Sequence, residues 1–233
     1  MHAKSVQFGV DPLMGPFKFI GPLVMTVIVG ALLAIYGKIF GLTTLHWVAK
    51  PLTTLVLVIA IWYNGDQGRW YTRAIVTGMA LSLLGDIALL SNDLFMAGLL
   101  LFAMAYIAYL VGLSHRVRFA AHILPFVLAA IFAALVLQGL WPKLPAAVQW
   151  PVFAYVLLIS AMAAQAWVCY LERGDRLARY AAIGATLFLV SDALLAIDRF
   201  IVALPLAVVW ILVPYWMAQT LIAISVNRSD GSR

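Results

Sequence analysis

Charged residues are scarce in this chain of 233 residues. Asp, Glu, Lys and Arg together make up only 10% of it, whereas hydrophobic residues make up 65%. A soluble globular domain usually carries about 25% charged residues. The mean hydropathy of +1.04 points the same way. The composition therefore excludes an ordinary soluble domain and predicts one integral membrane domain over residues 1–233.

Cysteine and histidine are also rare, which excludes several kinds of chemistry. Cys169 is the single cysteine, so the chain cannot form an internal disulfide. The four histidines, His2, His46, His115 and His122, fall in segments expected on different sides of the membrane, so they cannot form a three-ligand zinc site. The sequence also lacks a glycine-rich phosphate loop and a G-x-S-x-G turn. We therefore expect no metal site.

The formal net charge of +6 would suggest nucleic acid as a partner of a soluble protein. Here the basic residues lie mainly in short segments between apolar runs, where they orient a chain in the membrane. We therefore expect no nucleic acid partner.

Eight apolar runs are long enough to cross the hydrocarbon core of a bilayer. Lipid leaves helix as the only conformation for such runs, because every backbone polar group must be satisfied within the segment. The sequence therefore predicts an all-α polytopic membrane protein with eight transmembrane helices. They cover approximately residues 19–36, 48–63, 70–90, 94–113, 119–140, 148–171, 180–197 and 204–226.

The basic residues are distributed unequally between the two sides that eight spans define. With an even number of spans, both termini and every second loop share one side. Lys38, Lys143 and Arg199 fall on the opposite side, with Lys50 at a helix start. By the positive-inside rule both termini are cytoplasmic, and we expect the bacterial inner membrane. The first side holds eleven basic residues: Lys4, Lys18, Arg69, Arg73, Arg116, Arg118, Arg173, Arg176, Arg179, Arg228 and Arg233.

Two apolar runs contain a carboxylate in similar surroundings. Asp86 follows Gly85 in the third run, and Asp192 follows Ser191 in the seventh. Aligning these two residues suggests two parallel four-helix repeats, with halves at 19–113 and 119–226. An ionisable residue within a membrane span is costly, so each is a candidate for function.

The predicted topology brings further polar residues to the same depth as the two acids. The third and seventh helices both run outward, so both carboxylates lie in the outer half of the bilayer. Lys50, Tyr106 and Tyr215 reach this region from neighbouring helices, and Gln219 shares a helix face with Tyr215. We therefore expect these groups, with Ser191, to line one cavity that opens on the non-cytoplasmic side.

Other interpretations of the same residues remain open. Asp86 can pair with Lys50 merely to fix helix packing, and Asp198 with Arg199 resembles an interfacial ion pair. A proton-coupled or lipid transporter also carries acids at such positions in parallel repeats. A hydrolase fits as well, because a buried carboxyl group is a usable general acid and a second carboxylate can stabilise an oxocarbenium ion.

Several short motifs resemble the YhhN family, which includes the mammalian TMEM86 lysoplasmalogenases. The match extends from the second to the eighth predicted helix. The family often has a histidine in its fourth helix where this chain has Tyr106, so any proton chemistry of that histidine would pass here to a phenol. The segments that match are Lys50-Pro51-Leu52-Thr53, Leu84-Gly85-Asp86, residues 102–109, residues 191–196 and residues 215–223.

This resemblance implies a hydrolase that cleaves the vinyl ether bond of lysoplasmalogens and needs no cofactor. The products would be a fatty aldehyde and glycerophosphoethanolamine or glycerophosphocholine. One of Asp86 and Asp192 would protonate the outer alkene carbon, and the other would stabilise the cation and position water. Lys50 would hold the phosphate of a lysophospholipid that lies within the bilayer. A homodimer is compatible with this prediction.

Overall fold

The computed structural model describes residues 20–65 and 69–226. The described residues are almost entirely helical and contain no strand. Two short 3-10 turns, η1 (Asn92–Leu94) and η2 (Trp141–Lys143), precede α4 and α6. The long helices are α1 (Ile20–Ile39), α2 (Thr43–Asn64), α3 (Trp70–Ala88), α4 (Phe95–Arg116), α5 (Ile123–Leu140), α6 (Ala146–Arg173), α7 (Arg176–Phe200) and α8 (Ala207–Ile224).

Seven helices of the described part are long and apolar enough to cross a membrane. The chain is thus an integral membrane protein, as its composition predicts. The helix outside that set is α3, which carries Arg73 and Asp86 within 19 residues. Two charges lower the hydropathy of a helix that is only just long enough to span. The crossing of the membrane by α3, and with it the count of eight spans, stays a prediction.

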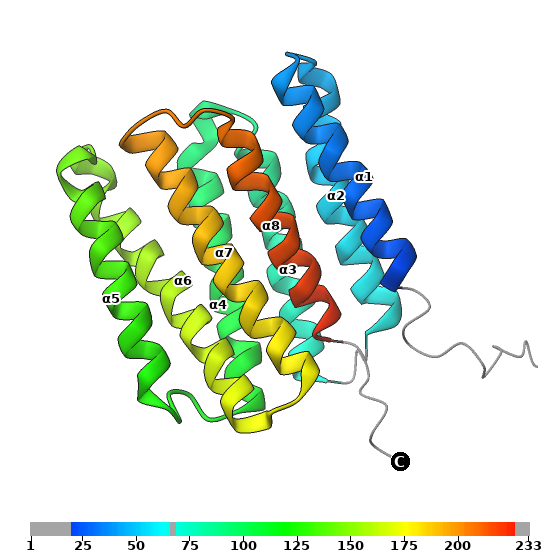
Figure 1. Cartoon of the computed structure of the whole chain (residues 1–233), viewed down its shortest axis with the longest axis vertical. Helices are drawn as coiled ribbons and strands as arrows, with labels where there is room; N and C mark the ends of the chain where they lie inside the picture. The colour runs from blue at the N-terminus through cyan, green and yellow to red at the C-terminus, as the bar shows by residue number, and fades with distance from the viewer. Residues whose placement is uncertain (1–19, 66–68, 227–233) are drawn as a thin grey trace, which may run out of the picture.

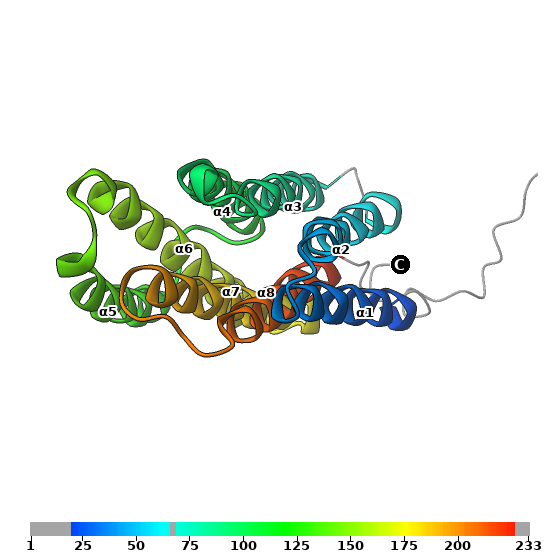
Figure 2. The ribbon, with the colours of Figure 1, turned by 90° about the horizontal axis from the view of Figure 1, so that it is seen from above.

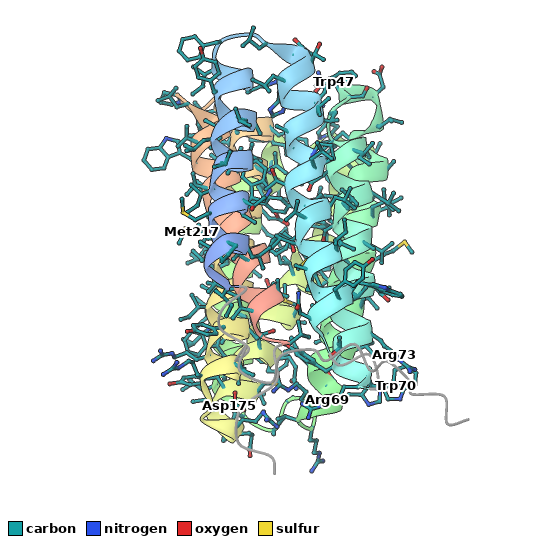
Figure 3. The ribbon with its side chains drawn as sticks, turned by 90° about the vertical axis from the view of Figure 1, so that its right-hand side faces the viewer. Trp47, Arg69, Trp70, Arg73, Asp175 and Met217 are labelled. Atoms are coloured by element: carbon teal, nitrogen blue, oxygen red, sulfur yellow. The ribbon has the colours of Figure 1, made fainter. Side chains whose placement is uncertain are left out.

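Consecutive helices alternate in direction, and the described chain begins and ends at the same end of the bundle (Figure 1). Viewed from above, α5, α7, α8 and α1 form one row, while α4, α3 and α2 lie on its other side and α6 runs obliquely between (Figure 2). Arg69 and Arg73 lie at the end of the bundle where α1 begins, and Trp47 lies at the other end (Figure 3). Because the helices alternate, the end of α4 at Arg116 and the turn from Arg173 to Arg176 also lie at the first end, whereas Arg199 lies near the other end of α7. We call these the arginine-rich end and the opposite end. Lys4, Lys18, Arg228 and Arg233 lie outside the described residues.

The helix α2 begins earlier than the apolar run predicted. It starts at Thr43, just after Gly41 turns the chain with a φ of +71°, so Pro51 lies inside the helix rather than at its start. The predicted start at about residue 48 was too late, because residues 43–47 are less apolar than the span but still belong to the helix. As a consequence, Lys50 is two turns into α2 and is buried.

Small residues allow α3 and α4 to lie close together. A Cβ at Gly78 would fall 2.3 Å from the Tyr109 ring, and one at Gly85 would fall 2.7 Å from the Phe102 ring. Small residues at helix interfaces let backbones approach, which is how helices associate where the hydrophobic effect is absent. This packing fixes the helix that carries Asp86 against the helix that carries Tyr106.

Asp175 caps the start of α7 with its side chain, and Asp198 makes a hydrogen bond near the end of the same helix. Asp175 accepts a hydrogen bond from the Ala178 backbone N–H at 2.7 Å and so caps the start of α7. Burial opposes the charge of Asp175, but this bond and the nearby Arg173 outweigh burial and lower the pKa of Asp175.

At the opposite end, the expected Asp198–Arg199 pair is replaced by other partners. Asp198 accepts a hydrogen bond from the Leu204 N–H at 2.8 Å, and Arg199 donates to the Asn92 side chain at 2.7 Å.

Candidate active site

Asp86 lies at the centre of a buried polar cluster between α2, α3 and α8, and only 1% of its surface is exposed. Its Oδ1 lies 3.3 Å from the ammonium of Lys50. Its Oδ2 accepts hydrogen bonds from the Thr54 and Tyr215 hydroxyls, each at 2.6 Å. Both carboxylate oxygens are therefore occupied by protein donors.

A chain of hydrogen bonds continues from this cluster across α8 to α4. Gln219 donates to the Tyr215 hydroxyl at 3.1 Å, and Tyr109 donates to the Gln219 carbonyl at 3.2 Å. The hydroxyl of Ser82, one turn before Asp86, lies 3.4 Å from that of Tyr109. Each buried polar group here has a partner, as a stable apolar bundle requires. The network joins α3, α4 and α8 around Asp86.

Asp192 is held by a similar pair of hydroxyl groups. Its Oδ2 accepts hydrogen bonds from Tyr106 on α4, at 2.5 Å, and from Tyr155 on α6. The two phenol oxygens lie 3.1 Å apart. In the described part of the chain, Asp192 Oδ1 has no protein donor and Asp192 has no cationic partner. Each acid therefore accepts two hydroxyl hydrogen bonds at Oδ2. At Oδ1 they differ, because only Asp86 has a cationic partner there among the described residues.

The partners of the two acids come from corresponding helices of the two predicted halves. Asp86 on α3 is bonded from α2 and α8, whereas Asp192 on α7 is bonded from α6 and α4. Each acid thus receives one hydroxyl from its own half and one from the other half. This exchange is the pattern that two parallel repeats would produce, although the repeat itself stays a prediction.

Aromatic rings lie between the two clusters. Phe188 contacts Tyr106 with ring centroids 5.2 Å apart and contacts Tyr215 at 5.4 Å, both edge to face. Phe102 contacts the same two tyrosines at 6.4 Å and 6.0 Å. Among the described residues, no hydrogen bond joins one cluster to the other. The predicted arrangement of both acids around one open cavity is thus replaced by two clusters with rings between them.

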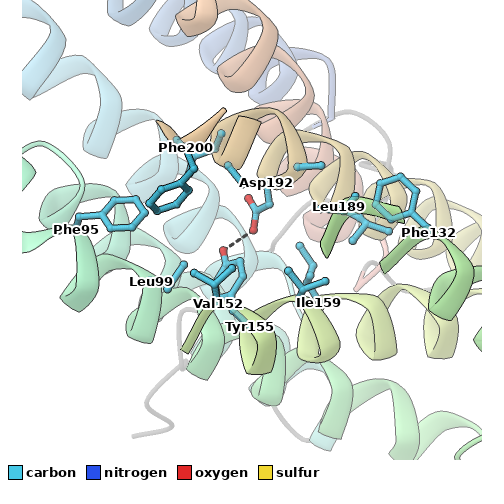
Figure 4. A pocket seen from close by; sticks show the side chains of 14 residues that line it. Phe95, Leu99, Phe132, Val152, Tyr155, Ile159, Leu189, Asp192 and Phe200 are labelled. Atoms are coloured by element: carbon cyan, nitrogen blue, oxygen red, sulfur yellow. Dashed lines mark hydrogen bonds between the residues drawn. The ribbon is translucent and has the colours of Figure 1, made fainter. Parts of the chain in front are cut away.

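An apolar pocket reaches the Asp192 cluster but not the Asp86 cluster. It lies between α4, α5, α6 and α7, and Asp192 and Tyr155 are its polar lining residues (Figure 4). Phe95 and Phe200 line the pocket toward the ends of their helices. Asp192, whose Oδ1 has no donor among the described residues, therefore borders an apolar space.

The structure places the residues predicted for substrate binding in different surroundings. Lys50 pairs with Asp86, as the packing interpretation held, while Tyr106 is fully buried behind Asp192. Tyr215 and Gln219 share a face of α8 and belong to the Asp86 cluster. Ser191 donates to the Ile211 carbonyl at 2.9 Å and so links α7 to α8. The roles of these residues in binding stay predictions.

Two site residues were missed from the sequence. Tyr155 and Thr54 are both buried and each bonds one of the acids. Thr54 stands one turn after Lys50, so the helical spacing of i and i+4 could have found it. Tyr155 offered no such signal, because a phenol within an apolar run also fits ordinary helix packing.

Comparison with known proteins adds to this geometry. The model of the YhhN family matches residues 45–226. The chain belongs to the YhhN family. The matched region includes both acids and every hydroxyl that bonds them.

Relatives of this YhhN chain include named enzymes and unassigned proteins. Lysoplasmalogenase TMEM86B of Rattus norvegicus is 32% identical over 189 residues, which are 79% of this chain and 76% of the relative. Lysoplasmalogenase TMEM86B of Homo sapiens is 33% identical, with 79% and 78% covered. The uncharacterized membrane protein YhhN of Escherichia coli O157:H7 is 26% identical over 170 residues, or 72% of this chain and 80% of that protein. No solved structure matches this chain significantly.

Proposed function

We propose that this protein is a membrane lysoplasmalogenase, which hydrolyses the vinyl ether bond of a lysoplasmalogen. The observation that carries the proposal is Asp192, which lines an apolar pocket and whose Oδ1 has no donor among the described residues. The names of the TMEM86B relatives support the substrate class. The alkenyl chain of the substrate would lie in the pocket with its vinyl ether at Asp192.

The proposed reaction begins with protonated Asp192. The carboxyl proton on Oδ1 passes to the outer carbon of the alkene, and the ether oxygen shares the positive charge as an oxocarbenium ion. Water adds to the cationic carbon and loses a proton to the Asp192 carboxylate. The resulting hemiacetal collapses to a fatty aldehyde and the glycerophospho-base. One acid therefore serves first as donor and then as base, so the proton returns to its origin.

The two phenols support this role of Asp192. Tyr106 and Tyr155 both donate to Oδ2, so they stabilise the negative charge that appears when the proton leaves Oδ1. They also hold Oδ2, which leaves Oδ1 as the oxygen available to the substrate in this proposal. Hydrogen bonds to a charged group contribute about 1.5–3 kcal/mol each, enough to change a rate by one to two orders of magnitude.

Asp86 takes the supporting role in this proposal. Its carboxylate lies beside the Lys50 ammonium, behind the rings of Phe102 and Phe188. A negative charge close to an oxocarbenium ion stabilises it most strongly where water is excluded. The same ion pair holds α2 against α3, so Asp86 contributes to the fold as well as to the reaction.

Arg199 is better placed than Lys50 to hold the phosphate of the substrate. It stands seven residues after Asp192 on α7, which places it about 10 Å farther along the same helix face. Its guanidinium lies 4.8 Å from the ring centroid of Phe95, which lines the pocket. Arg199 is exposed, and Lys50 is buried. Because Arg199 lies at the end opposite the arginine-rich end, the pocket would open on the non-cytoplasmic side.

The experiment that tests this function is aldehyde release by the purified protein in detergent. A lysoplasmalogen is compared with the matched lysolipid whose chain is joined by a saturated ether. We expect aldehyde from the vinyl ether and none from the saturated ether, because only an alkene can accept the proton on carbon. A well-folded protein that binds both lipids but releases no aldehyde would contradict the proposal and favour a lipid carrier.

A further inference from the structure

A second, polar pocket lies at the arginine-rich end, between the start of α3 and the ends of α4, α6 and α8. Its lining includes Arg116, Arg173, His115, Asp175 and Ser225. Leu177 of α7 also lines it and precedes Asp192 by 15 residues, which corresponds to about 22 Å along the helix. The pocket is therefore too far from Asp192 to receive the phosphate of a lipid whose vinyl ether lies there.

Arg116 carries an unsatisfied group beside this pocket. Its guanidinium lies over the ring of Tyr71, 4.3 Å from the centroid. Its Nη1 is buried and has no hydrogen-bond partner among the described residues. A buried donor without a partner is unfavourable, and more so when it is charged. Arg116 also lines the pocket, where an anion would neutralise its charge.

Charge in the pocket also favours an anion. The lowered pKa of Asp175 keeps its carboxylate ionised, but Arg173 already pairs with it at 2.8 Å. In the described part of the chain, Arg116 has no carboxylate of its own. Among the described residues that line the pocket, Arg116 therefore has a positive charge that no carboxylate pairs with.

The first turn of α3 adds backbone donors to the same pocket. Trp70, Tyr71 and Thr72 all line it, and the N-cap residue Arg69 makes no capping hydrogen bond with its side chain. The first N–H groups of a helix have no partner within the helix and bind anions well. The start of α3 and Arg116 are therefore separate features of one pocket, and both suit an anion.

We propose that this pocket binds a phosphate group at the membrane surface of the arginine-rich end. The fork of an arginine and the N–H groups of a helix start both match the oxygens of a phosphate. Basic pockets between membrane helices bind lipid headgroups in this way. The phosphate belongs either to an anionic lipid headgroup or to a free phosphate from solution. The proposal does not depend on the vinyl ether hydrolysis.

Thermal unfolding of the full chain tests the proposal. Delipidated protein in detergent is titrated with inorganic phosphate at constant ionic strength, with chloride as the reference anion. In parallel, phosphatidylcholine nanodiscs contain either phosphatidate or diacylglycerol, which differ only by the phosphate. We expect phosphate or phosphatidate to raise the melting temperature by about 2–4 °C, the shift that roughly 1 kcal/mol of binding energy produces in a chain of this size.

The matched variants are Arg116→Gln and Arg118→Gln. Arg118 is exposed two residues farther along and does not line the pocket. Arg118→Gln should respond as the wild type does, whereas Arg116→Gln should weaken binding at least tenfold through loss of a charged hydrogen bond. If Arg116→Gln does not fold, Arg116→Lys keeps the charge without the fork and should still bind less tightly.

The outcomes separate the two sources of phosphate. A response to inorganic phosphate in detergent identifies free phosphate, and a response only to phosphatidate identifies a lipid headgroup. No response to either, or an Arg116 variant that responds as fully as the wild type, would overturn the proposal. Aldehyde release is not needed for any of these results.

Discussion

At the scale of single residues, Arg199 beside the pocket and Lys50 beside Asp86 should have different roles, one in substrate binding and the other in stability. Arg199 is exposed next to Phe95 at the pocket, whereas Lys50 is 7% exposed and pairs with Asp86. Because Arg199 is exposed and Lys50 is buried, we expect Arg199 to contact the substrate and Lys50 to stabilise the helix bundle.

The variant Arg199→Gln should raise KM for a lysoplasmalogen about tenfold and change kcat little. An interaction with a remote phosphate is made equally in the ground and transition states, so its loss weakens binding alone. Alkenylglycerol, which lacks the phosphate, should show no such difference between variant and wild type. Lys38→Gln, at the same end but on α1, is the control. An equal effect of Arg199→Gln on both substrates would contradict phosphate recognition.

The variant Lys50→Met should destabilise the protein, because it leaves the Asp86 carboxylate buried without its partner. Breaking a buried ion pair typically costs about 3–5 kcal/mol. The double variant Lys50→Met with Asp86→Asn should regain much of that stability, as measured by thermal unfolding in detergent. A Lys50→Met protein that melts as the wild type does, but binds lysolipid weakly, would instead support the predicted role of Lys50 in phosphate binding.

At the scale of secondary structure, the fit of α3 against α4 is as important as either acid. Gly78→Ala would place a methyl group against the ring of Tyr109, which belongs to the hydrogen-bond chain of the Asp86 cluster. Overpacking of this kind costs about 1–3 kcal/mol, so we expect the melting temperature to fall by several degrees. Gly21→Ala has open space around it and should melt unchanged. Equal melting of the two variants would contradict the close α3–α4 packing.

The helices themselves could largely be predicted from apolar runs, because lipid permits little else. Their ends could not. The predicted run at 180–197 lies inside α7, which begins at Arg176 because Asp175 caps it outside the apolar segment. Likewise α6 extends to 28 residues and includes Pro151. Polar turns at membrane ends continue a helix without adding to its hydropathy.

The candidate site could be predicted only in part. Asp86 and Asp192 stood out because a carboxylate in an apolar run is costly. The separation of the two acids by Phe102 and Phe188 depends on which helix faces meet, and that is a property of tertiary packing. For the same reason the sequence offered the Lys50–Asp86 pair only as one of two interpretations, and it could not show that Asp192 Oδ1 has no donor among the described residues.

At the scale of the whole molecule, the arrangement of charge predicts the orientation of the bundle. Apart from Arg199, the arginines of the described residues lie on helix ends or turns at the end where the described chain begins and ends, and such clusters of basic residues face the cytoplasm. A reporter that is active only in the cytoplasm should therefore work when fused to the C-terminus and fail when inserted in the turn between α5 and α6. Activity at both positions, or only in the turn, would contradict cytoplasmic termini and the outward opening of the pocket.

The central claim is that Asp192 transfers the proton, and one comparison tests it most directly. Aldehyde release from a lysoplasmalogen is measured for wild type, Asp192→Asn, Tyr155→Phe and the exposed control Asp93→Asn, with the melting temperature of each. We predict that Asp192→Asn loses at least about a thousandfold in kcat, because an amide cannot act as general acid. Tyr155→Phe should lose about tenfold or more, and Asp93→Asn nothing, while all four stay folded. An Asp192→Asn protein that releases aldehyde at the wild-type rate would contradict the account.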